Sequence, residues 1–408
     1  MTDNRFKVLV TDEVDPEGIA ILRAEPSIEV VESPTLPAQQ LLEEIPQYDA
    51  LIGRSATKVS RELLEAGTRL KVIGRAGVGV DNVDLEKATE LGIAVINAPG
   101  GNVVAVAELF FGVAVSIFRH VHVADELMRK GEWPRSRLGG IELRGRTLGV
   151  IGLGRIGGEV ARRAKAFGMR VIAYDPYVAV SRFEEVGVER AESLHAALDV
   201  SDVVTVHTPL TQETRGLIGA PELARLKRDA VVLNLARGGI VDEEALVDAL
   251  ENGRLAGAGL DVYAKEPRAP DHPLRTLPNV LLTPHLGAST EEAQVNVAID
   301  VAEQIVDCLA QRPVRYAVNA PIIILPNIFE PELCQKLIGL YEEHGGTESG
   351  FLNPTAFIIF NVVFFGLCIW LSARLRKHSF AQDDDGLVEQ ERRRFRLAPS
   401  CCPEYFLS

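Results

Sequence analysis

Short apolar runs alternate with amphipathic stretches from the N-terminus to about residue 98. The apolar runs are rich in β-branched residues, which favours strands, and the stretches between them have the spacing of helices. Strands that alternate with helices in this way predict a parallel sheet that is covered on both faces. The predicted strands are 6–10, 50–52, 70–73 and 94–96, and the predicted helices are 16–23, 37–44, 60–66 and 85–91.

A second series with the same alternation follows a long helical stretch at 103–130. Its roughly six strands match the number in a complete dinucleotide-binding sheet. A last helix, 289–311, has apolar residues at every fourth position from Ala293 to Ile305. The predicted fold class is therefore α/β, with a doubly wound (Rossmann) cofactor domain and a flavodoxin-like substrate domain. The strands of the second series are predicted at 147–151, 170–174, 203–205, 231–233, 257–262 and 280–282.

The two series also predict how the domains divide the chain. We expect the cofactor domain at 99–288, and a substrate domain that combines 1–98 with the returning segment 289–320. A ligand cleft is expected between them, because ligand sites are frequent at domain interfaces. Residues 321–408 do not continue the pattern and form an atypical tail.

The tail contains one apolar segment, 355–373, which is about as long as the roughly 20 residues of a bilayer crossing. Three basic residues follow it at 374, 376 and 377, and the positive-inside rule would then place the rest of the chain outside the cytoplasm. That location does not suit a chain whose first residues carry no signal peptide. The tail is therefore interpreted as a fused or frameshifted remnant, or as a membrane-associated segment, and it is the only part expected to contact a membrane.

Charge and cysteine positions restrict the partners and the compartment. The formal net charge of −14 disfavours nucleic acid and anionic membrane surfaces, so any anionic ligand must be held by local basic or backbone N–H groups. All five cysteines lie at or after Cys308, so no disulfide framework or zinc spacing precedes it, and no metal is expected. Residues 1–7 lack the apolar region of a signal peptide, and a cytoplasmic location is expected.

A glycine-rich motif lies between the first strand and first helix of the second series. Gly152, Gly154 and Gly157 have the spacing of a dinucleotide-binding turn, and a second strand follows as that motif requires. Gly152 permits a tight turn, Gly154 lets the backbone approach a pyrophosphate, and Gly157 lets helix and strand pack closely. The pyrophosphate would then meet the positive end of the helix dipole. The alternative is a glycine-rich turn without a ligand.

The second strand of this series ends at Asp175, about 18 residues after Gly157 and close to the roughly 20 expected for a ribose-binding acid. A carboxylate accepts hydrogen bonds from both ribose hydroxyls and repels a 2′-phosphate. No Arg or Lys follows directly, so the sequence favours NAD over NADP. The alternative is an Asp that caps a helix.

Three ionisable residues lie at or just after predicted strands: Arg237, Glu266 and His285. Oxidation of a secondary alcohol needs a base for the hydroxyl proton, and His suits that role near neutral pH. Glu266 would orient His285, and the planar fork of Arg237 would grip a substrate carboxylate. Each residue alone is more often structural or a surface charge. Together they closely match one family of dehydrogenases, and this resemblance implies hydride transfer between a nicotinamide and the hydroxyl-bearing carbon of a small 2-hydroxy acid.

Over residues 1–320 the chain resembles the D-isomer-specific 2-hydroxyacid dehydrogenases. The resemblance is carried by the Gly152 motif, by the Arg, Glu, His order, and by the motifs at 54–58, 74–84, 97–102 and 285–290. It implies NAD-dependent oxidation of 3-phosphoglycerate to 3-phosphohydroxypyruvate, the first step of serine biosynthesis, by a homodimer or homotetramer. The alternatives are another D-2-hydroxy acid, or a non-catalytic NAD-sensing protein like the corepressors of this fold. The intact Arg, Glu, His set favours an enzyme.

The resemblance also implies roles for further residues. Contacts to the cofactor are implied for Arg155 and Ile156 (pyrophosphate), Thr208 (ribose), Asp261 (nicotinamide carboxamide), Val78, Ala236 and Gly287. Substrate contacts are implied for Arg54, Ser55, Arg75, Gly77 and Arg135. Arg135 and Trp133 lie in a region that reaches a dimer partner in this family. The alternative for Arg54 and Arg75 is simple solvation at the surface.

The tail has a second, short resemblance. Residues 321–351 resemble the opening of a bacterial iron and 2-oxoglutarate oxygenase domain. Such an iron site needs two His and a carboxylate. Only His344 and His378 follow, and neither has a carboxylate two residues later, so no oxygenase activity is expected.

Overall fold

The computed structural model describes residues 5–33 and 36–319. The predicted apolar segment 355–373 and the oxygenase-like segment 321–351 lie outside the described residues. The described residues form two separate sheets, and all the strand pairs within them are parallel. The predicted α/β class with a doubly wound sheet is confirmed.

The first sheet has the strand order β2-β1-β3-β4-β5, which is the flavodoxin-like order. Its strands are β1 (Phe6–Val10), β2 (Ile28–Glu32), β3 (Ala50–Gly53), β4 (Val72–Arg75) and β5 (Ala94–Asn97). The pattern of apolar residues did not predict β2. Its sequence carries Glu29 and Glu32, because it is an edge strand that is only partly buried.

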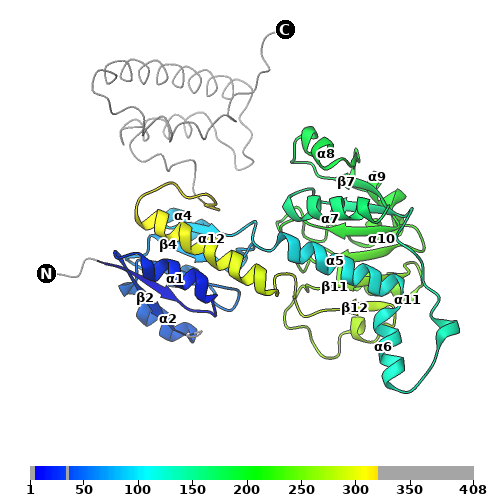
Figure 1. The fold of residues 1–408 in the computed structure, drawn as a ribbon, viewed down its shortest axis with the longest axis horizontal. Helices are drawn as coiled ribbons and strands as arrows, with labels where there is room; N and C mark the ends of the chain where they lie inside the picture. Colours follow the sequence, from blue (N-terminus) through cyan, green and yellow to red (C-terminus); the bar gives the residue numbers. More distant parts are fainter. Residues whose placement is uncertain (1–4, 34–35, 320–408) are drawn as a thin grey trace, which may run out of the picture. The chain divides into compact units, whose positions relative to one another are not determined.

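Helices cover both faces of this sheet because successive side chains of a strand point to opposite sides. Val8 and Val10 face α1 and α12, whereas Leu9 faces α2, α3 and α4. The helix α12, drawn in yellow in Figure 1, lies beside α1 although it comes from the other end of the described chain. The helices are α1 (Pro16–Ala24), α2 (Ala38–Glu44), α3 (Arg61–Ala66), α4 (Leu85–Glu90) and α12 (Glu291–Leu309), with a 3₁₀ turn η1 (Ile45–Gln47).

The second sheet has the order β12-β11-β10-β9-β6-β7-β8, which is the doubly wound order with one added strand. It has one strand more than the pattern predicted, because β8 is a two-residue, exposed edge strand. Its strands are β6 (Thr147–Ile151), β7 (Arg170–Tyr174), β8 (Glu189–Arg190), β9 (Val203–Val206), β10 (Val231–Asn234), β11 (Gly257–Leu260) and β12 (Val280–Leu282).

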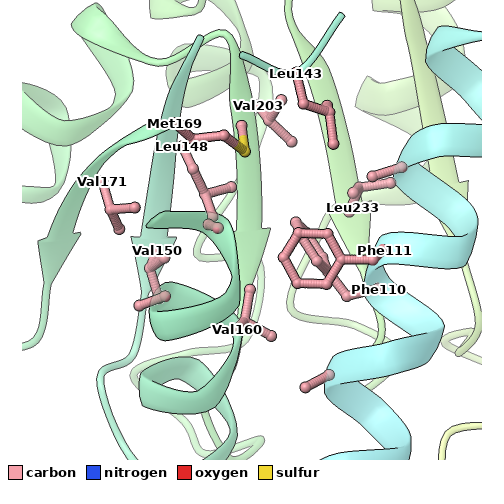
Figure 2. Close-up of a cluster of buried hydrophobic side chains, with 14 of the residues drawn as sticks. Phe110, Phe111, Leu143, Leu148, Val150, Val160, Met169, Val171, Val203 and Leu233 are labelled. Atoms are coloured by element: carbon pink, nitrogen blue, oxygen red, sulfur yellow. The ribbon is translucent and has the colours of Figure 1, made fainter. Parts of the chain in front are cut away.

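Two apolar cores lie on the two faces of the second sheet. On one face, α5, α7 and α8 pack over the sheet, and Figure 2 shows Phe110 and Phe111 of α5 beside Leu233 and Val160. On the other face, α9, α10 and α11 cover the strands. The helices are α5 (Val103–Phe118), α6 (Val121–Arg129), α7 (Arg155–Ala166), α8 (Val180–Val186), α9 (Leu194–Val200), α10 (Ala220–Arg225) and α11 (Glu243–Glu251), with 3₁₀ turns η2 (Arg135–Arg137) and η3 (Pro273–Arg275).

The prediction of one helical stretch at 103–130 is wrong at its middle. The stretch is two helices, α5 and α6, bent by 65° from one another. His120 lies between them with φ 53°, which is a left-handed conformation. The sequence has no glycine or proline at this position that would have predicted the break. In the described ranges no single helix is long and apolar enough to cross a membrane, although this bent pair meets that test when its two helices are taken together.

The contact between α1 and α12 is close enough to require a glycine. A Cβ added at Gly18 would lie 2.6 Å from the carbonyl oxygen of Ala298, whereas a Cβ at Gly112 in α5 would meet nothing within 4 Å. Gly112→Ala should stabilise the protein by roughly 0.5–1 kcal/mol through helix propensity. Gly18→Ala should instead destabilise it by about 1–3 kcal/mol because of overpacking. Urea unfolding of both variants measures the difference, and two equal shifts would contradict the contact.

Candidate active site

The glycine-rich motif forms the turn from β6 into α7. Gly152 has φ 96°, and a Cβ there would lie 2.7 Å from the carbonyl oxygen of His207. A Cβ at Gly157 would lie 2.0 Å from the carbonyl oxygen of Gly152, so strand and helix pack as closely as predicted. Gly154 is the N-cap of α7 and has open space on its Cβ side. The first N–H groups of α7, including those of Arg155 and Ile156, have no partner within the helix.

Asp175 ties this turn to the end of β7. Its Oδ2 accepts a hydrogen bond from the backbone N–H of Leu153 at 2.8 Å, and its Oδ1 accepts from Tyr177 at 2.9 Å and Val178 at 3.2 Å. Asp175 is not the cap of α8, which begins after Ala179. An ionised carboxylate has about four acceptor positions, so about one position remains for a ribose hydroxyl beside these three donors.

Sequence reasoning missed a second residue that holds the same turn. Arg182 of α8 donates from Nε to the carbonyl oxygen of Leu153 at 3.3 Å and from a terminal nitrogen to that of Gly154 at 3.2 Å. No motif marks this residue, because the contact depends on how α8 folds back over the turn.

The end of β9 brings two shielded polar atoms next to Gly152. Thr208 Oγ1 and His207 Nδ1 are buried and have no hydrogen-bond partner in the described part of the chain, while His207 Nε2 lies 3.0 Å from Thr205 Oγ1. Burial lowers the pKa of His207 to about 4. Thr208 was predicted to contact the ribose, whereas His207 was not predicted. Unpaired polar atoms beside a phosphate-binding turn are what a bound dinucleotide would satisfy.

The loop after β10 presents Arg237. The buried side chain of Asn234 donates to the carbonyl oxygen of Arg237 at 2.9 Å and accepts from the N–H of Ala236 at 3.2 Å. Arg237 Nε donates to Asp81 Oδ2 at 2.7 Å. Gly238 is needed for a close approach, because a Cβ there would lie 1.8 Å from the carbonyl oxygen of Tyr263. The Arg237 loop therefore packs directly on the loop that carries Glu266.

Glu266 and His285 form a hydrogen-bonded pair. Glu266 Oε2 lies 2.8 Å from His285 Nδ1, and Glu266 Oε1 accepts from the N–H of Tyr263 at 3.0 Å. An ionised carboxylate only accepts hydrogen bonds, so it holds the tautomer with the proton on Nδ1 and leaves Nε2 free to accept one. Both side chains line a cavity of about 440 Å³, together with Arg268 and Arg275.

Asp261 fixes the loop that carries His285. Its side chain is 1% exposed, and its Oδ1 accepts from Thr283 Oγ1 at 2.6 Å and from the N–H of Leu286 at 2.7 Å. Oδ2 accepts from the N–H of Gly287 at 2.8 Å. The predicted contact of Asp261 with a nicotinamide stays a prediction, while the structure shows that both of its oxygens hold the 283–287 loop.

Arg54 and Arg75 lie where β3 and β4 end. The backbone N–H of Arg54 donates to Asp12, and its carbonyl oxygen accepts from Asn82 at 2.9 Å. Arg75 Nε is buried without a partner in the described residues, and its pKa is lowered to about 10 by burial and then by the charges of Arg237 and Arg54. Three guanidinium groups are therefore close enough to repel one another, which suits a site for an anion.

The other predicted substrate residues differ in placement. A Cβ at Gly77 would lie 2.1 Å from a terminal nitrogen of Arg75, so the glycine lets that side chain fold over the loop. The carbonyl oxygen of Val78 accepts from Asn97 at 2.6 Å. Ser55 is exposed beside Arg54. Arg135 lies in η2, is exposed, and forms no hydrogen bond or ion pair within 5–33 and 36–319.

The doubly wound sheet and its glycine-rich turn together define a domain of the dinucleotide-binding class. Residues 111–287 match the family model "D-isomer specific 2-hydroxyacid dehydrogenase, NAD binding domain". Two solved structures are similar to this chain over 77% of its length, each with a TM-score of 0.71, and the chain covers 100% and 98% of them. They are the TT0316 protein of Thermus thermophilus, which is 38% identical, and a glyoxylate reductase from Paecilomyes thermophila, which is 32% identical. The chain belongs to the D-isomer specific 2-hydroxyacid dehydrogenase family and contains its NAD-binding domain.

Curated relatives give a finer comparison. The D-3-phosphoglycerate dehydrogenase of Archaeoglobus fulgidus is 48% identical over 325 residues, which is 80% of this chain and 61% of that enzyme. The chain therefore spans about three fifths of the length of the curated relatives that it matches.

The shielded His207 should make stability depend on pH. Its pKa is about 4 in the folded protein against an ordinary value of 6.5. As pH falls from 6.5 to about 4, the unfolded chain binds a proton that the folded protein does not, so the free energy of unfolding falls by up to roughly 1.4 kcal/mol per pH unit. His207→Gln should lose this component and show a shallower decline. Urea titrations at several pH values test this, and parallel curves would contradict it.

Proposed function

We propose that the protein oxidises 3-phosphoglycerate to 3-phosphohydroxypyruvate with NAD, the first step of serine biosynthesis. The observation that carries the proposal is the hydrogen-bonded pair of His285 and Glu266, whose Nδ1 and Oε2 atoms lie 2.8 Å apart. The loop that presents Arg237 packs on the loop that carries Glu266. Identities of 43–48% to curated D-3-phosphoglycerate dehydrogenases support this substrate.

NAD is proposed to bind along the ends of β6, β7 and β9. The open backbone at Gly154, the unpaired Thr208 Oγ1 and the carboxylate of Asp175 suit a pyrophosphate, a ribose and a free 2′-hydroxyl in turn. A 2′-phosphate would meet the charge of Asp175, which supports NAD over NADP. When bound, NAD supplies the hydride acceptor.

His285 is proposed as the base. Its Nε2 takes the proton of the substrate hydroxyl while a hydride leaves the carbon that carries this hydroxyl. The alcohol thereby loses two electrons and two hydrogens and becomes a ketone. Glu266 stabilises the imidazolium that forms and keeps the ring oriented. Arg237 holds the substrate carboxylate and polarises the developing carbonyl oxygen, exchanging its bond with Asp81 for one with the substrate.

Arg54 and Arg75 are proposed to bind the phosphate. The lowered pKa of Arg75 reflects burial and unbalanced positive charge, which an anionic ligand would relieve. A second candidate is another D-2-hydroxy acid as the substrate. It is favoured by one observation: the chain covers 98% of the solved glyoxylate reductase but only about three fifths of the curated phosphoglycerate enzymes.

We also propose that the protein is a homodimer or homotetramer. The support is α6, which has no buried residue in the described structure, and the apolar side chains exposed there and just beyond it. Val121 is 51% exposed, Met128 48% and Trp133 78%. Light scattering measures the mass of the assembly directly.

A substrate panel that follows NADH absorbance tests the function. Arg75→Gln should reduce kcat/KM for 3-phosphoglycerate by on the order of 10-fold more than for D-lactate or D-glycerate, since a dianion gains most from charge-assisted bonds. Arg23→Gln, on the 62% exposed arginine of α1, is the matched control and should behave as wild type. Turnover of unphosphorylated acids alone, with equal losses in Arg75→Gln, would favour the second candidate.

Removing the base gives the strictest test of the mechanism. His285→Ala should lower kcat by at least roughly 100-fold, the usual loss for a general acid–base group. NADH affinity should hardly change, because the glycine turn and Asp175 hold the dinucleotide. His195→Ala, on an exposed histidine of α9, is the matched control and should keep full turnover. Near-normal turnover of the His285 variant would remove that residue from the mechanism.

A further inference from the structure

A buried ion pair connects the start of α11 to the loop that carries Glu266. Glu243, the first residue of α11, has a side chain that is only 8% exposed, and its Oε2 lies 2.6 Å from the guanidinium of Arg268, which is 14% exposed. Glu243 Oε1 accepts from the backbone N–H of Ala264 at 2.5 Å. One carboxylate therefore holds the chain on both sides of Glu266, two residues before it and two residues after it.

The helix itself does not require this arrangement. Asp242 is the N-cap of α11 and already accepts from the N–H groups of Glu244 at 3.0 Å and Ala245 at 3.1 Å. A buried ion pair costs desolvation energy and is often no more stabilising than apolar residues of similar size. Stability alone therefore gives no clear reason for a charged residue at position 243.

The same carboxylate also connects two parts of the site. Glu243 follows the Arg237 loop, whose Gly238 packs on the backbone of Tyr263 and Ala264. From there the Tyr263 N–H donates to Glu266 Oε1, and the other oxygen of Glu266 faces His285 Nδ1. The Glu243–Arg268 pair thus lies where a small movement of the 264–268 loop would change the distance from Glu266 to His285.

We propose that Glu243, paired with Arg268, is a positioning residue for the reaction: it holds Glu266 against His285 and so keeps the imidazole in the tautomer that leaves Nε2 free. The inference rests on the proposed function for its effect on turnover. Its effect on the tautomer of His285 does not depend on which substrate is used.

Glu243→Gln is the first variant, because the amide oxygen can still accept from Ala264 while the ion pair with Arg268 is lost. We expect kcat to fall by on the order of 10- to 100-fold, as for other small misplacements of catalytic groups, with KM for NAD and NADH affinity unchanged. Glu244→Gln, on the exposed neighbour in the same helix, is the matched control and should retain wild-type kcat.

The tautomer gives a readout that a merely structural role would not move. Long-range proton–nitrogen NMR spectra of the neutral His285 ring, assigned by its loss in His285→Ala, should show Nδ1–H in the wild type and a mixture with Nε2–H in Glu243→Gln. Wild-type kcat together with a wild-type tautomer in Glu243→Gln would overturn the proposal. If the wild type oxidises no 2-hydroxy acid at all, the proposed function fails and the NMR spectra alone decide the positioning role.

A second variant guards against loss of folding, since Glu243→Gln leaves Arg268 buried without its partner. The double variant Glu243→Gln, Arg268→Met has no unpaired buried charge, and it should show the same fall in kcat and the same mixed tautomer while binding NADH normally. The single variant Arg268→Met should also lower kcat, whereas Arg268→Lys keeps the charge and should retain most of the wild-type kcat. A double variant with wild-type kcat and tautomer would show that the pair serves stability only.

Discussion

Parallel strand pairing is the constraint on which the candidate site depends. Every strand pair within each described sheet is parallel, so the carboxyl ends of all the strands of a sheet emerge at one edge. The Gly152 turn, Asp175, the Arg237 loop and Asp261 all follow strands of the second sheet and share that edge. A parallel pair needs a long crossover connection, and each helix that provides one also returns the chain to the opposite edge. The backbone topology alone therefore brings together residues that are far apart in the sequence, and no specific side-chain contact is needed to do so.

Carboxylates that bind backbone N–H groups hold the loops at this edge in defined conformations. Asp175 accepts from three N–H groups and Asp261 from two N–H groups and a hydroxyl, while Glu243 accepts from one N–H group and forms an ion pair with a guanidinium. Hydrogen bonds to an ionised group are stronger than neutral ones, so each carboxylate restricts a loop that would otherwise be mobile. The loops can then carry His285 and Glu266 in one geometry, as a reaction that depends on exact distances requires.

The sequence predicted the interior of both sheets because their central strands are short apolar runs. It failed at β2 and β8, whose polar residues reflect edge positions, and at His120, where the helix breaks without a glycine or proline. Residues inside recognisable motifs, such as Gly152 and His285, could also be found in advance. His207, Arg182 and Glu243 could not, because each acts through a contact that exists only after distant loops have folded together. For the same reason the sequence showed Asp261 as a candidate ligand contact but not as the anchor of a loop.

The position of α12 has a consequence for how the chain is synthesised. Val301 and Ile305 of this helix cover one face of the first sheet, and Gly74 in β4 leaves the space that they fill. When residues 6–97 leave the ribosome they can pair as strands, but α1 alone covers one face of their sheet until residue 309 has been made. The whole second sheet is translated between residue 97 and α12. It can therefore complete its core before the first sheet does. The first sheet is therefore expected to complete its core after the second sheet, so that the order of folding along this chain runs against the order of translation.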